Sequence, residues 1–296
     1  MSRIGLLVGA LVTVVVIAWL AGAFDSDYTT VELPEWTFDR DLADRITLAT
    51  PADTVVIARS GDRWRMNVPV ESVVDSTRTN QLLDELEELS FASVVSTNPE
   101  RQVKFGVDSL GSSIVVHAGN DERRLIVGNS GPDYQTVYVR LGGDDRVLSS
   151  RGRVSINATA EYWRDRTIMS VPGDAVTGVR VEMSDGSFGV SRLSGRWMLE
   201  EAGASAIADS SAVARWIRRF APLTGSRFAT EEAFESASHL AIITFDTAGG
   251  SSAGLELRDS GSELLARRPG SRDVLTISAG MQASLLPAAT SLSADR

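Results

Sequence analysis

An internal duplication constrains the fold of this chain more than any other feature. Residues 46–64 align without a gap on residues 179–197, at an offset of 133, and both segments end in Arg-Trp. One residue later in register, Asp75-Ser76-Thr77 matches Asp209-Ser210-Ser211, and the apolar residues Leu83, Leu86 and Leu89 match Ile217, Phe220 and Leu223. Two copies predict a pair of similar units, because a solenoid needs three or more repeats.

Each copy opens with the alternation of apolar and polar residues that is typical of antiparallel strands. The alternation surrounds a turn at Pro51-Ala52-Asp53 in the first copy and at Asp185-Gly186 in the second. The apolar period then changes to that of a helix. We expect this helix behind a cap at Asp75 or Ser76 in the first copy, and over residues 209–221 in the second.

Short apolar segments separated by glycine-rich turns follow in both copies and predict an antiparallel meander. The expected strands are 114–116, 125–127, 137–139 and 146–148 in the first copy, and 242–245, 255–257, 264–266 and 274–276 in the second. Hairpin-connected strands therefore outnumber helices. We predict an α+β fold with two tandem copies of a mainly antiparallel β-sheet unit and one covering helix on each.

The N-terminus carries an uncharged run over residues 4–24, preceded by Arg3 and followed by Asp25 and Asp27. A run of this length spans a bilayer, whereas the core of a signal peptide is usually about 7 to 15 residues long. The charge step places the N-terminus inside and the rest of the chain outside the cytoplasm. We expect an uncleaved, single-pass transmembrane helix, with cleavage after Ala23 as the alternative.

These patterns divide the chain into segments. We expect a transmembrane anchor at 1–24, a stalk at 25–41, a first repeat at 42–157, a linking helix at 158–170, a second repeat at 171–287 and a flexible tail at 288–296.

Composition excludes several classes of function. The chain has no cysteine, so disulfides, thiolate metal sites and cysteine nucleophiles are excluded. Its formal net charge of -10 argues against nonspecific binding to nucleic acid. Apolar residues make up 43% of the chain, enough for the core of each copy.

Several segments of the first copy together resemble a known bacterial family. The most specific is Asn98-Pro99-Glu100 leading into Phe105-Gly106-Val107-Asp108. With Gly61-Asp62-Arg63-Trp64, Val127-Gly128, Val137-Tyr138-Val139-Arg140 and Trp163-Arg164-Asp165-Arg166, it resembles the domain of unknown function 4340 family over residues 34–285. The resemblance implies a membrane anchor and an association with gliding-motility-type ABC transporters, but no catalytic residues. The second copy departs from it, since residues 230–234 lack the Phe-Gly step.

Residues able to carry chemistry are few. His117 and His239 stand without a metal-ligand spacing, and we interpret both as structural. Gly250-Ser251-Ser252-Ala253-Gly254 matches a nucleophile elbow literally, but strand-like residues flank it on both sides, which indicates a hairpin loop. We therefore predict no enzyme activity, no cofactor and no metal.

Two clusters are candidate binding sites. Arg215, Arg218 and Arg219 surround Trp216 on the second helix and suit an acidic partner or lipid phosphates, with a solvated helix face as the alternative. The second cluster, Trp163, Arg164 and Arg166, lies between the copies, where it lines a groove or packs the halves together.

Three functions follow from these observations. The first is a membrane-anchored extracytoplasmic accessory or scaffold protein that partners an ABC-type transporter or another envelope complex. The second is a module that binds a glycan or lipid, which a deep apolar groove between the copies would favour. The third and most remote is a hydrolase, which needs Ser, His and an acid to converge.

Overall fold

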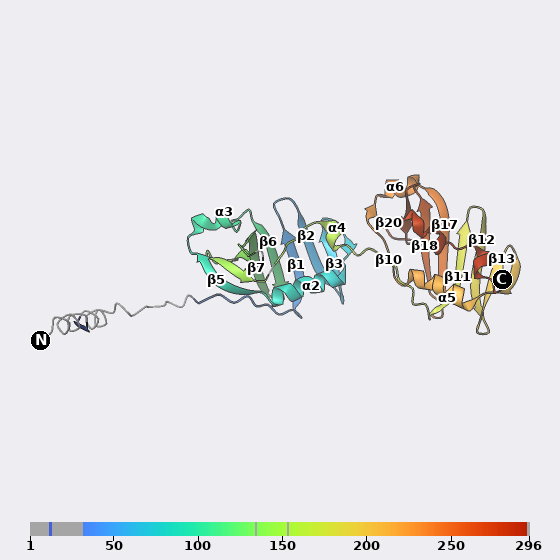
Figure 1. Ribbon diagram of the computed structural model, residues 1–296, viewed down its shortest axis with the longest axis horizontal. Helices are drawn as coiled ribbons and strands as arrows, with labels where there is room; N and C mark the ends of the chain where they lie inside the picture. The colour runs from blue at the N-terminus through green and yellow to red at the C-terminus, as the bar shows by residue number, and fades with distance from the viewer. Residues whose placement is uncertain (1–11, 14–31, 134, 153, 295–296) are drawn as a thin grey trace, which may run out of the picture.

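The computed structural model describes residues 12–13, 32–133, 135–152 and 154–294. Two large antiparallel sheets lie next to each other along the molecule, and the helices α2 and α5 cover the two sheets on the same side (Figure 1). The fold is mainly antiparallel β-structure with few helices.

The first sheet and its helices come from the N-terminal half of the chain. The elements are β1 (Ala43–Ala49), β2 (Thr54–Ser60), β3 (Arg63–Val68), β4 (Ser72–Val73), α2 (Ser76–Glu87), β5 (Ser90–Ser96), η1 (Pro99–Arg101), α3 (Gln102–Phe105), β6 (Ser112–Ala118), β7 (Asp121–Ser130), β8 (Val137–Leu141), β9 (Val147–Arg151) and α4 (Ala160–Trp163).

The second half repeats this order after a short strand, β10 (Thr167–Met169). Its elements are β11 (Val176–Met183), β12 (Gly186–Leu193), β13 (Arg196–Glu201), β14 (Ala204–Ile207), α5 (Ser210–Ile217), η2 (Arg218–Phe220), β15 (Leu223–Thr224), β16 (Phe228–Ala229), α6 (Glu231–Ser236), β17 (Ser238–Thr247), β18 (Ser252–Asp259), β19 (Glu263–Arg267), β20 (Val274–Ser278), η3 (Ala279–Met281), α7 (Gln282–Leu285) and η4 (Ala289–Leu292).

The two nine-stranded sheets have the same strand order. The first runs β4-β3-β2-β1-β6-β7-β8-β9-β5, and the second runs β14-β13-β12-β11-β17-β18-β19-β20-β16. The register agrees as well, because Ile46 lies opposite Ile57 and Val179 lies opposite Val190. Trp64 and Trp197 take equivalent places on β3 and β13, as the duplication predicts.

Each copy has one long helix, and the two helices begin with the same kind of N-terminal cap. The Asp75 carboxylate accepts a hydrogen bond from the Thr77 amide at 2.9 Å, and the Asp209 carboxylate accepts one from the Ser211 amide at 2.8 Å. These bonds satisfy amides that the first turn of a helix leaves free. The apolar side of each helix then packs on one face of its sheet. The buried residues are Leu82, Leu83 and Leu86 on α2, and Val213, Trp216 and Ile217 on α5.

A second, shorter helix lies on the opposite face of each sheet and was not expected from the sequence. Phe105 of α3 packs against a cluster that includes Val107 and Ile126. In the other half, Phe234 of α6 packs against Leu265 and Val274. The segment 230–234, which lacks the Phe-Gly step, therefore takes the same place as the family-specific segment of the first half.

The predicted segment boundaries need correction. The linking helix expected over 158–170 is a single turn, α4, followed by β10, and α4 packs into the first core through Trp163. The predicted tail contains η4, whose Ala289 and Leu292 are buried in the second core. Trp36, in the predicted stalk, is buried in the first core.

The two halves end in the same way. The Asp75 amide donates to the Trp163 carbonyl at 2.8 Å, and the Asp209 amide donates to the Leu292 carbonyl at 2.8 Å. Each half therefore closes by returning its last turn to the N-terminus of its own helix. We call residues 33–165 repeat 1 and residues 166–294 repeat 2.

No helix among the described residues is long and apolar enough to cross a bilayer. The predicted anchor at 4–24 lies outside the described residues, except for Val12 and Thr13, which are helical.

Candidate functional site

Arg164 joins the two repeats. Its guanidinium donates to the Asp273 carboxylate at 2.5 Å and to the Ser72 hydroxyl at 3.3 Å, and it lies over the Phe228 ring at 3.4 Å from the ring centroid. Ser72 belongs to repeat 1, whereas Phe228 and Asp273 belong to repeat 2. A planar, permanently charged group suits this combination of stacking and hydrogen bonding.

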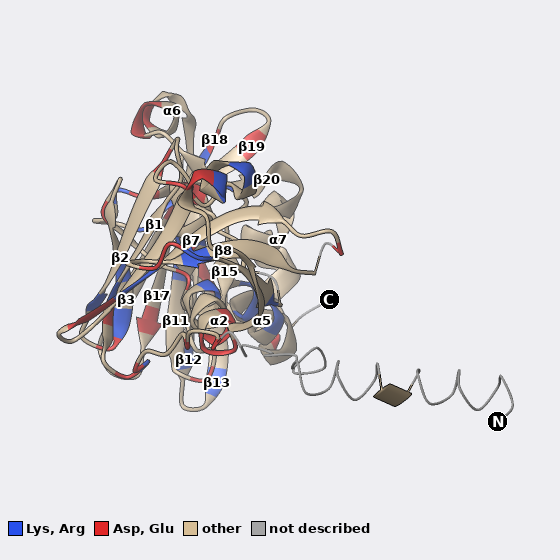
Figure 2. Cartoon of the chain, turned by 90° about the vertical axis from the view of Figure 1, so that its left-hand side faces the viewer, with Lys and Arg blue, Asp and Glu red and all other residues tan. Residues whose placement is uncertain are grey.

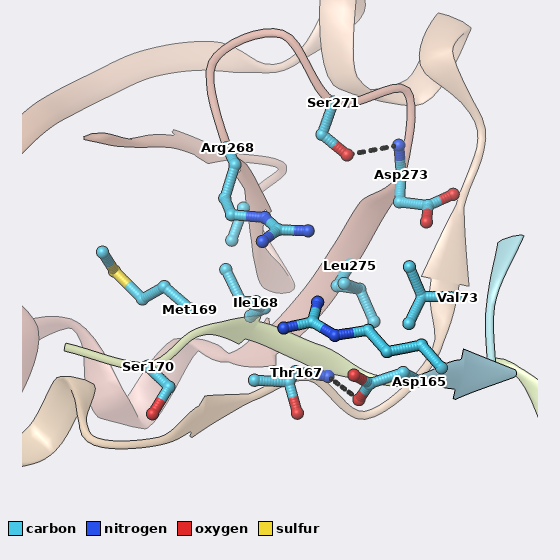
Figure 3. Close-up of a pocket in the computed structure, with 12 residues that line it drawn as sticks. Val73, Asp165, Thr167, Ile168, Met169, Ser170, Arg268, Ser271, Asp273 and Leu275 are labelled. Atoms are coloured by element: carbon cyan, nitrogen blue, oxygen red, sulfur yellow. Dashed lines mark hydrogen bonds between the residues drawn. The ribbon is translucent and has the colours of Figure 1, made fainter. Parts of the chain in front are cut away.

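A cleft of about 270 Å³ lies at this junction, beside β10 (Figure 3). Its floor includes Ile168 and Leu275, and Arg268 extends over it from the β19–β20 loop. Inside the cleft the Thr167 amide donates to the Asp165 carboxylate at 2.8 Å. Charged and hydroxyl side chains line much of the cleft, so it is not the deep apolar groove that would favour a lipid- or glycan-binding module.

The other two residues predicted for the groove lie apart from this cleft. Trp163 is buried in the core of repeat 1, where its indole N–H donates to the Asn157 carbonyl at 2.6 Å. Arg166 donates to the Ser226 carbonyl at 2.9 Å, within repeat 2. Of the three predicted residues, Arg164 makes the contacts across the junction.

The arginine cluster on repeat 2 is exposed, but its tryptophan is not. Arg215, Arg218 and Arg219 are exposed and pair with no described side chain. Trp216 is buried, donates to the Leu285 carbonyl at 2.9 Å and packs against Phe188 and Phe220. Trp216 therefore lies in the core of repeat 2 and does not form a surface cluster with the three arginines, although the sequence had suggested one.

The family-specific segment of repeat 1 presents two large apolar side chains to solvent. Val103 is 70% exposed and Leu110 is 76% exposed. Between them, Phe105 packs edge-on against Tyr138 with ring centroids 4.7 Å apart, and Arg140 donates to the Val107 carbonyl at 2.8 Å. The backbone of this segment is thus fixed to the sheet while Val103 and Leu110 remain outside. We call residues 98–110, together with the neighbouring strand β5, the α3 end.

The strand β5 forms the edge of the sheet at the α3 end. It has seven residues, none of them charged, and it pairs only with β9 among the described residues. Two register shifts interrupt that pairing. In repeat 2 the counterpart is divided, because β15 pairs with β10 and a two-residue β16 remains on the sheet. An uncharged edge strand of this length offers backbone groups for pairing with another chain.

A charged turn supports the α3 end. Arg146 holds the Asp144 carboxylate through two nitrogens, with a shortest distance of 2.7 Å, and donates to the Glu32 carbonyl at 3.1 Å. This hydrogen-bonded guanidinium holds the pKa of Asp144 below its usual range. The Gln102 side chain donates to the Asp145 carbonyl at 3.0 Å, so the turn also anchors α3.

The residues considered for chemistry are separated in the structure. Ser252 begins β18 within an antiparallel hairpin, and its hydroxyl donates to the Asp246 carboxylate at 3.0 Å. A strand, not a helix, follows it. No group of three or more His, Asp or Glu side chains in the described part of the chain is placed to hold a metal ion.

The architecture defines a protein of two tandem antiparallel β-units with identical strand order. The chain belongs to the family described as a domain of unknown function, DUF4340, whose model matches residues 64–241. The match includes the α3 end and runs across the junction into β17. No curated protein and no solved structure matches the chain.

Proposed function

We propose that this chain is a membrane-anchored, extracytoplasmic accessory or scaffold protein that holds a protein partner at its α3 end. The partner is a subunit of an ABC-type transporter or of another envelope complex. The chain acts by binding and carries no catalytic activity of its own.

The observation that carries this proposal is the exposure of Val103 and Leu110 on a rigid segment. Single exposed apolar side chains are common on protein surfaces, but two of them on one short segment beside the edge strand β5 offer a combined apolar contact for another protein. Next to them, β5 supplies an uncharged edge that a partner strand can extend.

The path of the chain supports a site close to a membrane. Arg146 binds the Glu32 carbonyl, so the described chain begins beside the α3 end. Figure 1 shows repeat 2 at the far end of the molecule from α3 and β5. If residues 4–24 span the membrane, the α3 end is the part of the molecule that lies nearest to it, within reach of a membrane complex.

Site-specific photo-crosslinking in the producing cells tests the docking site. A photoreactive residue placed at position 103 or 110 of the full chain should form an adduct with one envelope protein, identified by mass spectrometry. Val103→Asp together with Leu110→Asp should lower recovery of that partner about tenfold or more, because a charge at an apolar contact removes a main part of the binding energy.

Leu193 provides the matched control, since it is 66% exposed but lies on β12 of repeat 2. A crosslinker at 193 should not capture the same protein, and Leu193→Asp should leave its recovery unchanged. Equal capture from position 193, or no adduct from positions 103 and 110, would refute docking at the α3 end.

Topology is tested separately with protease added to intact spheroplasts. The domain should be digested while the N-terminal fragment stays with the membrane. A protected domain would contradict the extracytoplasmic location, and a mature N-terminus at Phe24 would contradict the anchor.

A further inference from the structure

The sheet of repeat 1 has a face that α2 does not cover, which we call the open face. α3 lies over the β7–β9 side of this face. On the β1–β3 side, Arg45 and Arg65 are exposed, and Val73, opposite Arg65 on β4, lines the cleft at the junction with repeat 2. In an antiparallel pair, residues directly opposite each other project from the same face, so the register shows which side chains share it.

Three arginines lie on the open face on alternate strands. Arg65 on β3 is opposite Ala58 on β2, and Ala58 is opposite Arg45 on β1. Thr47, two residues from Arg45 and therefore on the same face, is opposite Val115 on β6, and Val115 is opposite Arg124 on β7. Because neighbouring strands lie about 4.8 Å apart, Arg65 and Arg45 stand about 10 Å apart, and Arg124, displaced by two residues along its strand, stands about 12 Å from Arg45.

All three side chains are exposed, and none pairs with another described side chain. They place three positive charges on one face of a chain whose net charge is -10. Gly142 lies close to Arg124, since a Cβ at position 142 would come within 2.9 Å of the Arg124 Cβ. Glycine at 142 thus leaves room for the arginine stem. Figure 2 shows basic residues in blue on β3 and neighbouring strands.

Repeat 2 shows that the fold does not require these arginines. By strand order and register, the counterparts of Arg45, Arg65 and Arg124 are Gly178, Met198 and Gly254. The pairing is the same in both repeats, yet these three positions are charged in repeat 1 alone, and the corresponding face of repeat 2 carries Arg180 at the position of Thr47. These three arginines, which packing in the sheet does not require, form a positively charged surface that is open to an anionic ligand.

We propose that the open face of repeat 1 binds a linear anionic polysaccharide whose carboxylates meet Arg45, Arg65 and Arg124. A guanidinium binds a carboxylate through two parallel hydrogen bonds, so each arginine accommodates one acidic sugar. Between the arginines stand Ala58, Thr47 and His117, and the first two are small enough for the polymer to lie close to the sheet. This site is separate from the protein-docking site at the α3 end.

The spacing favours a polysaccharide over other polyanions. In an extended acidic peptide, side chains on one face recur about every 7 Å, which is shorter than two strand widths. Single-stranded nucleic acid is bound by stacking bases on aromatic rings. The described residues between the arginines include one such ring, His117, which lies 3.7 Å from the Glu122 carboxylate, whereas Ala58, Thr47, Val56 and Val115 offer none. The same four residues lack the large apolar groups that insert into a membrane surface.

Binding of hyaluronate oligosaccharides to the full-length chain, purified in neutral detergent, tests the proposal by isothermal titration calorimetry. Hyaluronate carries one carboxylate per disaccharide, a spacing close to two strand widths. The triple variant Arg45→Ser, Arg65→Ser, Arg124→Ser should bind about tenfold more weakly or worse, since three exposed charge contacts are lost. Added salt should weaken binding of the unaltered chain.

The matched control is Arg215→Ser, Arg218→Ser, Arg219→Ser, which removes the same charge from exposed positions of repeat 2. It should bind hyaluronate like the unaltered chain. Equal loss in both triple variants, or no hyaluronate binding by the unaltered chain, would overturn the proposal. Tighter binding of polyglutamate, polyphosphate or phosphatidylglycerol vesicles would replace the polysaccharide with that class. Circular dichroism checks the fold of each variant, and partner capture at position 103 is unaffected by any of these results.

Discussion

Repeat 1 and repeat 2 share their strand order and the register of their first hairpin, but they differ in their exposed side chains and in one edge strand. Both place a bulge at the start of their central strand, between Ala43 and Arg45 and between Val176 and Gly178. Both stack an arginine over the equivalent tryptophan, Trp64 or Trp197. The comparison teaches that buried alternation maintains the pairing, because a one-residue slip would turn every core residue toward water.

Strand register does not constrain the exposed residues, so the outer surfaces of the two repeats differ. Repeat 1 carries the open-face arginines, the exposed Val103 and the continuous edge strand β5. Repeat 2 has glycine or methionine at the arginine positions, and two residues before Phe234 it has Glu232, where repeat 1 has Val103 two residues before Phe105. We therefore expect repeat 1 to carry the binding sites and repeat 2 to support it.

The largest expected effect tests whether the two repeats have independent cores. Phe220 and Leu86 occupy equivalent positions of α5–η2 and α2, and both are fully buried, in separate clusters. Phe220→Ala should destabilise repeat 2 by about 3–5 kcal/mol, and Leu86→Ala should destabilise repeat 1 by about 2–5 kcal/mol, because each leaves a cavity. Scanning calorimetry of the full chain should show two transitions, each variant lowering one of them. A single transition lowered equally by both variants would show that the repeats unfold as one unit.

A smaller effect is expected at the junction. Arg164→Ala removes the bonds to Ser72 and Asp273 and leaves the buried side of that carboxylate without its cation. We expect a loss of about 1–3 kcal/mol of coupling between the repeats. Hydrogen exchange should accelerate at β4 and β16 while the cores stay protected.

Arg166→Ala is the control for the junction, since Arg166 contacts the Ser226 carbonyl within repeat 2. It should leave exchange at β4 unchanged. If Arg164→Ala also leaves β4 and β16 unchanged, the repeats are held together by other contacts.

The sequence was sufficient to predict most of the strands and both capped helices. Alternation around Asp185-Gly186 and the Asp75 cap depend on neighbours in the chain, so a single sequence reveals them. The duplication also predicted that Trp64 and Trp197 share a position. The short helix α6 was missed because its six residues are too few to show a period, and Phe234, which packs on the sheet, holds it in place.

The candidate sites were less accessible to sequence reasoning. Arg215 of α5 and Arg218 and Arg219 of η2 were found because they lie within five residues of one another. Arg45, Arg65 and Arg124 are far apart in sequence and come together through strand pairing. Trp216 was misjudged because its neighbours are basic, although its spacing from Val213 and Phe220 places it on the buried side. The prediction of a flexible tail was wrong because most residues of this segment are small or polar, which is typical of flexible ends, although Ala289 and Leu292 are buried.

The smallest effect is expected at the turn of Asp144 and Arg146, where repeat 1 binds the Glu32 carbonyl. Because Arg146 holds the pKa of Asp144 below its usual range, the ionised pair stabilises the fold above the unfolded pKa of about 4, and this contribution is lost as the pH falls through the lower folded value. Asp144→Asn should therefore lower the unfolding free energy of repeat 1 at pH 7 by up to about 1 kcal/mol, the upper range for a partly exposed pair. The difference from the unaltered chain should shrink as the pH is lowered below 4.

Asp145→Asn, which removes the exposed carboxylate next to Asp144, should have no such pH-dependent effect. Urea denaturation across this pH range measures both variants, and a loss that persists at low pH would mean that Asp144 stabilises the turn by packing and not by its charge.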